Sequence, residues 1–108
     1  MDLTDASFGE AVFAPQHTVL VEFWAPSQGR ASIQERLAVL EQLAALHADK
    51  IRVLRLDVEQ NPVAPLVYGV RRVPVAILFR GGEELGRWDA STPLADVVSR
   101  LVSGGSVP

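Results

Sequence analysis

The chain contains no cysteine among its 108 residues. Thiol–disulfide exchange requires a thiolate that attacks a disulfide sulfur, so this chain cannot perform that reaction with its own side chains. The lack of cysteine is compatible with any redox compartment and says little about location. Histidine is scarce as well, because His17 and His47 are the only two and lie far apart without metal-ligand spacing. We therefore expect no metal site and no cofactor.

Long apolar runs and clusters of basic residues are also missing. No segment approaches the roughly 18 unbroken apolar residues of a membrane span. The first residues, Met1–Ala6, are acidic and lack the basic-then-apolar order of a signal peptide. The net charge is −3, and the Lys and Arg residues are scattered. These features predict a cytoplasmic protein whose main partners are neither nucleic acids nor membranes.

The composition is that of an ordinary globular protein. Hydrophobic residues make up 48% of the chain and charged residues 21%, which is enough apolar material for one core. The length corresponds to a single domain. We expect this domain to span residues 1–103, followed by a flexible tail over residues 104–108 with the Gly/Ser composition of a linker.

Four segments have the pattern of β-strands. Val19–Phe23 and Val75–Phe79 are almost wholly apolar, which is typical of central strands buried on both faces. Ile51–Asp57 alternates apolar and polar residues, as a strand does. Gly81-Gly82 predicts a hairpin turn into a more polar edge strand over Glu83–Trp88.

Helical patterns alternate with these strands. The predicted helices are Thr4–Phe13, capped by Thr4 or Asp5 and ended by the Pro15–His17 turn; Ala31–Asp49; a short helix capped by Asn61 and ended by Gly69; and Ser91–Val102. The apolar stripe predicted for the second helix consists of Ile33, Leu37, Leu40, Ala44 and His47. The order predicts an α/β domain with a small mixed β-sheet between helices on both faces and one parallel strand pair. Met1–Leu3 could add at most a stub of a first strand.

Four stretches, taken together, resemble the thioredoxin family over nearly the whole chain. These are Val19–Pro26, Leu56–Pro62, Tyr68–Val75 and Leu78–Glu83. The resemblance implies a thioredoxin fold, with a central mixed sheet flanked by helices on both faces and a first strand that is short or missing. It also implies a protein-disulfide oxidoreductase ancestry.

The resemblance also implies which residues form the binding face. Pro74 matches the family's cis-proline, and the backbone of Val73 matches the segment that pairs with an extended substrate peptide. Trp24 matches the tryptophan beneath the active-site loop. With Ser27 and Ala90, these residues form the predicted peptide-binding surface.

Glu22 lies inside an apolar strand and matches the family's buried acid, while Arg55 matches a basic residue near it. One interpretation is that Glu22 is a proton acceptor tuned by its surroundings. The other is that it is an inherited acid that is paired with Arg55 or protonated. We favour the second, because there is no thiol for Glu22 to serve.

The departures from the family concentrate in the loop after Pro26. The segment Gln28, Gly29, Arg30 and Ala31 stands where the Cys-x-x-Cys motif is expected, and Ser27 replaces an exposed tryptophan. The stretch from Trp24 to Leu40 is two residues longer than is typical for the family. The Ser27-Gln28 pair is similar to thioredoxin-like co-chaperones that precede tetratricopeptide repeats, some of which lack the cysteine pair.

These observations favour a redox-inactive module that binds a protein or an extended peptide, with a chaperone-like role, over an enzyme. Arg30, Arg71 and Arg72 form either a basic rim that attracts acidic segments or an ordinary solvated surface. The alternative function is a protein of the disulfide-reductase class, serving cell redox homeostasis, that has lost its cysteines or uses cysteines supplied in trans. A third hypothesis is a structural or oligomerisation domain.

Overall fold

A computed structural model of the chain describes residues 2–13, 18–94 and 96. The elements are, in chain order, β1 (Asp2–Leu3), α1 (Asp5–Val12), β2 (Thr18–Trp24), the 3-10 helix η1 (Pro26–Gln28), α2 (Arg30–Leu46), β3 (Ile51–Asp57), α3 (Val63–Val67), β4 (Val75–Arg80) and β5 (Glu83–Asp89). Leu94 and Asp96 are also helical. The predicted turn at Pro15–His17, the rest of the last helix and the tail 104–108 lie outside the described residues.

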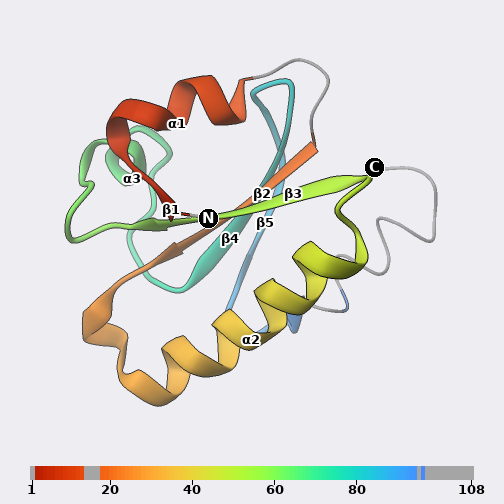
Figure 1. Cartoon of the computed structure of the whole chain (residues 1–108). Helices are drawn as coiled ribbons and strands as arrows, with labels where there is room; N and C mark the ends of the chain where they lie inside the picture. Colours follow the sequence, from red (N-terminus) through yellow and green to blue (C-terminus); the bar gives the residue numbers. More distant parts are fainter. Residues whose placement is uncertain (1, 14–17, 95, 97–108) are drawn as a thin grey trace.

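The strands form one five-stranded sheet in the order β1-β3-β2-β4-β5. β1 and β2 run parallel to β3, whereas β4 is antiparallel to both β2 and β5. The mixed sheet and the two-residue first strand confirm the predicted architecture. In Figure 1, α1 and α3 lie on one side of the sheet and α2 lies on the other.

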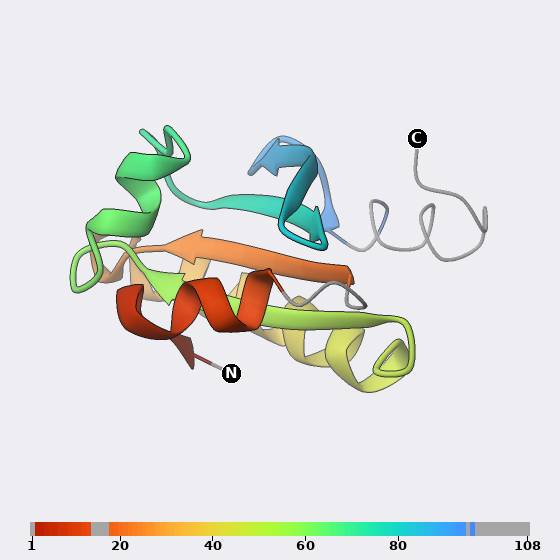
Figure 2. The same cartoon turned by 90° about the horizontal axis from the view of Figure 1, so that it is seen from above.

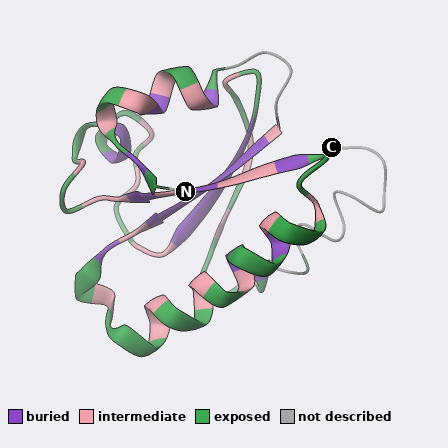
Figure 3. Cartoon of the chain, in the orientation of Figure 1, coloured by how far each residue is buried: buried purple, intermediate pink, exposed green. Residues whose placement is uncertain are grey.

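Two apolar clusters, one on each face of the sheet, form the core. Figure 3 shows that buried residues follow the strands, while the outward surface of α2 is exposed. The cluster on the side of α1 and α3 includes Phe8, Val12, Val19, Val21, Phe23, Leu54, Leu56, Ala64, Ile77 and Phe79. The cluster on the side of α2 includes Leu20, Leu40, Leu43, Ile51, Ala76, Leu78 and Leu94. Residues that alternate along β2 therefore enter opposite clusters, as expected for a strand buried on both faces.

Helix α1 begins with a reciprocal cap. The Ser7 backbone N–H donates to the Thr4 hydroxyl over 3.1 Å, and the Thr4 backbone N–H donates to the Ser7 hydroxyl over 2.9 Å. Of the two predicted capping residues, Thr4 is therefore the one that caps this helix.

The N-terminus of α3 is held by a residue far away in the sequence. The Asp5 carboxylate accepts hydrogen bonds from the backbone N–H groups of Val63 and Ala64, at 3.0 and 2.8 Å. The prediction that Asn61 caps this helix was wrong, because its side-chain oxygen instead accepts the Asp5 backbone N–H at 3.0 Å. The helix ends at Val67, and Gly69, the residue predicted to end it, follows two positions later with a positive φ of 66°.

The hairpin between β4 and β5 turns at the predicted glycines. Gly81 and Gly82 have φ angles of 57° and 86°, the left-handed region that a two-residue hairpin turn requires. A Cβ on Gly82 would also overlap the Phe13 ring, so the turn packs closely against the residue that follows α1. Among the described residues, no helix is long and apolar enough to cross a membrane.

Candidate functional site

The strand register brings three of the predicted contact residues to one end of the sheet. Phe23 pairs with Val75 on the neighbouring strand, and Val75 pairs in turn with Asp89. Strands in a sheet lie about 5 Å apart, so residues one position beyond this row lie side by side across three strand ends. Those residues are Trp24, Pro74 and Ala90.

Val73 presents backbone groups at this end of the sheet. The Val73–Pro74 peptide bond is cis. Within the described part of the chain, neither the N–H nor the C=O of Val73 has a hydrogen-bond partner. The Val73 side chain is only partly buried against the core. One backbone donor and one backbone acceptor are therefore unpaired among the described residues.

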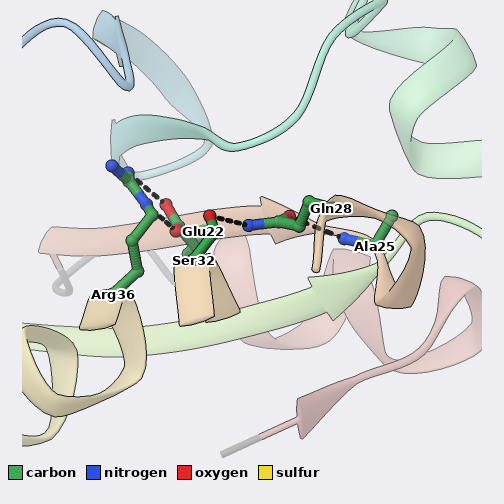
Figure 4. Close-up of polar contacts among 5 residues, drawn as sticks. All are labelled: Glu22, Ala25, Gln28, Ser32 and Arg36. Carbon is green, nitrogen blue, oxygen red and sulfur yellow. Dashed lines mark hydrogen bonds and ion pairs between the residues drawn. The ribbon is translucent and has the colours of Figure 1, made fainter. Parts of the chain in front are cut away.

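The loop that replaces the redox motif is braced by Gln28. Its side-chain oxygen accepts the Ala25 backbone N–H at 3.0 Å, and its side-chain nitrogen donates to the Ser32 hydroxyl at 3.1 Å (Figure 4). Gly29 follows with a φ of 99°, where a residue with a side chain would be strained. The amide of Gln28 thus links the end of β2 to the first turn of α2.

The remaining residues of this loop point to solvent. Ser27, Arg30 and Ala31 are exposed. No histidine lies in the loop to act as a base for the Ser27 hydroxyl. The loop therefore offers a surface for contact and contains no activated nucleophile.

Glu22 is the one buried charged residue among the described residues, and it is paired with Arg36 of α2. Its side chain is 1% exposed. The Arg36 Nε donates to one carboxylate oxygen, and its Nη2 donates to the other at 2.9 Å. This bidentate ion pair is drawn in Figure 4. The prediction that Arg55 pairs with Glu22 was wrong. Glu22 and Arg55 lie opposite each other on adjacent strands, but Glu22 forms its ion pair with Arg36 of α2.

Arg55 has a different role beside the site. Its guanidinium carbon lies 4.2 Å from the centre of the Trp24 ring, which is a cation–π arrangement. Its Nη1 lies 3.9 Å from an oxygen of the exposed Asp2 side chain, and its Nε is buried without a partner among the described residues. Arg55 therefore packs against the face of the Trp24 ring, and Glu22 is paired with Arg36 of α2.

The sequence held a signal for Arg36 that the predicted stripe missed. The two buried residues of α2 are Leu40 and Leu43. Arg36 precedes them by four and seven residues, a spacing that places all three on one face of a helix. The predicted stripe took Leu37 and Ala44 instead, which are only partly buried. A basic residue on the buried face opposite a buried acid was the available clue.

A groove of about 190 Å³ lies beside this ion pair, between α2 and the segment after β5. Its lining residues are Glu35, Arg36, Val39, Ala90, Ser91, Thr92, Pro93 and Leu94. Arg36 is 14% exposed, so its guanidinium spans from the buried carboxylate to this groove.

Asp89 is a negatively charged residue close to the arginines of the predicted basic rim. Hydrogen bonds from the Ser91 hydroxyl and backbone N–H hold the pKa of the Asp89 carboxyl below its usual range, and the charge of Arg72 adds to the effect. Arg30, Arg71 and Arg72 are all exposed, which fits both a basic rim and an ordinary solvated surface. Asp89 offsets one of these charges at neutral pH. Among the described residues, no group of three or more His, Asp or Glu side chains could hold a metal ion.

The fold and this strand-end geometry are those of an α/β domain of the thioredoxin type. A model of the thioredoxin family matches residues 1–103. The chain is 42% identical over 101 residues to a thioredoxin of Alicyclobacillus acidocaldarius, covering 94% of this chain and 93% of that one. It is 30% identical over 99 residues to a thioredoxin of Synechocystis, covering 92% and 91% of the two chains. A thioredoxin of Rickettsia prowazekii is 31% identical over 83 residues, or 77% of each chain. This chain belongs to the thioredoxin family, and it is a member without cysteine.

Proposed function

We propose that this thioredoxin-family domain is a redox-inactive module that binds an extended peptide or protein segment. Its binding region is the strand-end surface, defined as Trp24, Ser27, Val73, Pro74 and Ala90. The observation that carries the proposal is that the backbone N–H and C=O of Val73, beside this row, have no hydrogen-bond partner among the described residues. Chaperone-like activity and a cytoplasmic location remain parts of the proposal.

The physical basis is the addition of a strand. An extended peptide that lies along Val73 gains main-chain hydrogen bonds, and side chains around it select the sequence. The Gln28 amide fixes the neighbouring loop before any partner arrives. A preformed surface loses less conformational freedom on binding, which favours affinity.

The alternative is a protein of the disulfide-reductase class, and the name of the relatives favours it. Because the chain lacks a thiol, such activity would need cysteines supplied in trans. An insulin-reduction assay distinguishes the two. The proposal predicts only the background rate, with and without added thioredoxin reductase, whereas turnover above background would support the alternative.

The binding proposal is tested by titrating the ¹⁵N-labelled protein with synthetic extended peptides and following the amide signals. The probes are a leucine-containing peptide with alternating glutamates and a matched peptide with lysines. We expect the Val73 amide to shift and to gain protection from exchange. Val73→Pro removes the donor and is expected to abolish binding, while Val73→Ala keeps the N–H and should retain it. Equal binding by both folded variants would contradict the proposal.

A further inference from the structure

Helix α3 exposes three large aliphatic side chains on one short segment. Val63 is 57% exposed, Leu66 is 80% exposed and Val67 is 69% exposed. Residues three and four positions apart lie on the same helix face, so these three form one apolar surface, here called the α3 patch. Single exposed apolar residues are common, whereas exposed apolar residues that form a contiguous patch are typical of a surface that contacts a partner.

The α3 patch is held rigidly. Two side chains of the same helix, Ala64 and Pro65, are buried beneath it. Its first N–H groups are bound by Asp5, and after the helix the Val70 N–H donates back to the Pro65 carbonyl at 2.8 Å. The patch therefore needs little ordering when it binds, which favours affinity.

Helix α3 lies at the end of the molecule where the strand-end surface is found. Figure 2 shows α3, η1 and the segment that leads into β4 gathered at the same end of the molecule. Arg71 follows immediately after Val70, which is tied to α3. Arg71 is exposed and makes no ion pair within the described part of the chain. The backbone of Arg71 therefore lies close to α3, and its side chain adds an exposed positive charge at this end of the molecule.

The charge argues against a second copy of this chain as the occupant. A two-fold interface brings the same surface of both copies together, so it would enclose two Arg71 side chains, while the patch itself supplies no carboxylate to pair with them. The patch is also small. A helix of five residues is about 7.5 Å long, whereas stable interfaces bury at least about 1,200 Å² in total.

We infer that the α3 patch and Arg71 extend the strand-end surface and select partner segments that carry aliphatic side chains next to carboxylates. This inference rests on the proposed binding function and names the chemistry of the partner. The aliphatic side chains remove the α3 patch from water, and the carboxylate meets the guanidinium of Arg71.

The test measures binding of the two fluorescent peptides, leucine–glutamate and leucine–lysine, by anisotropy. The variants are the double change Leu66→Ser with Val67→Ser, and the single change Arg71→Glu. The matched control is Leu46→Ser, because Leu46 is a 64% exposed leucine at the far end of α2. All of these side chains are at the surface, so folding is expected to be retained and is checked by thermal unfolding.

We expect the glutamate peptide to bind the unchanged protein more tightly than the lysine peptide, with a preference that weakens as salt rises. The double variant should lose about tenfold in affinity for both peptides, which corresponds to about 1.4 kcal/mol. Arg71→Glu should reverse the charge preference, and Leu46→Ser should change neither.

The outcomes separate this inference from the proposed function. If Val73→Pro abolishes binding while the α3 variants bind like the unchanged protein, the binding function stands and the inference is overturned. If the unchanged protein binds neither peptide, both fail. If sedimentation shows a dimer that the double variant dissociates, the patch is an interface between copies and the partner chemistry proposed here is wrong.

Discussion

The buried ion pair of Glu22 and Arg36 allows the sharpest test of this structure. Glu22 is 1% exposed, and both of its carboxylate oxygens accept hydrogen bonds from one guanidinium. Replacing Arg36 with leucine leaves a carboxylate buried without a partner. Removing one member of a buried pair typically costs about 3–5 kcal/mol, and the total stability of a domain is about 5–15 kcal/mol. For a domain of this size, such a loss lowers Tm by more than about 10 °C.

The double variant Glu22→Leu with Arg36→Leu distinguishes stability lost through an unpaired buried charge from stability lost through altered packing. With both Glu22→Leu and Arg36→Leu, no buried charge remains, and such replacements are often neutral or stabilising. We therefore expect the double variant to be more stable than Arg36→Leu alone. Glu22→Leu alone should cost less than Arg36→Leu alone, because a long Arg36 side chain can turn its head to the solvent of the adjoining groove.

Chemical denaturation measures the free energy of unfolding of the unchanged protein, both single variants and the double variant. Arg30→Leu is the control, since it removes an exposed arginine from the first position of the same helix and should change stability by less than about 0.5 kcal/mol. The reasoning is refuted if Arg36→Leu is as mild as this control. It is refuted equally if the effects of the two single changes add in the double variant, because residues in one pair must show coupling.

Three further changes test other contacts. Asp5→Ala should destabilise the protein by about 1–2 kcal/mol, because α3 loses its cap; hydrogen exchange at the first amides of α3 should speed up, and unchanged exchange there would count against the cap. Gln28→Met keeps the side-chain size but removes both bridging hydrogen bonds, at about 1 kcal/mol each; the Ala25 amide should exchange faster, and a control at exposed Gln34 should leave it unchanged. The hydrogen bond from Arg87 lowers the pKa of Glu84, so this pair stabilises the fold above the ordinary pKa of glutamate and the gain is lost as pH falls through the lowered value. Glu84→Gln should therefore flatten the acid limb of the stability curve by about 0.2–1 kcal/mol, allowing for solvent screening, and superimposable curves would disprove the assignment.

Local patterns in this chain were enough to locate its elements. The apolar runs Val19–Phe23 and Val75–Phe79 became the central strands β2 and β4, each extended by one or two residues. Gly81 and Gly82 became the hairpin turn, and the Thr4 signal became the cap of α1. These features depend on residues within a few positions of one another, so periodicity and turn chemistry suffice to predict them.

The partners of buried charges were harder to predict, for a geometric reason. Arg55 was expected to pair with Glu22, and the register does place the two side by side. The choice between Arg55 and Arg36 depends on which guanidinium can reach both carboxylate oxygens, and that depends on how α2 sits over the sheet. Arg55 is instead occupied by the Trp24 ring. The capping of α3 by Asp5, across more than fifty positions of sequence, is the same kind of contact.

The sequence by itself determined that this protein has a thioredoxin fold, because the fold follows from the order of local patterns. It also determined that the chain cannot exchange disulfides alone, because it contains no cysteine. The tertiary structure alone decided that Glu22 pairs with Arg36 of α2, that Gln28 braces the loop in place of the redox motif, and that Val63, Leu66 and Val67 remain at the surface. Those outcomes depend on which distant segments meet, and the free energy of burying or pairing a side chain is set by its neighbours in space.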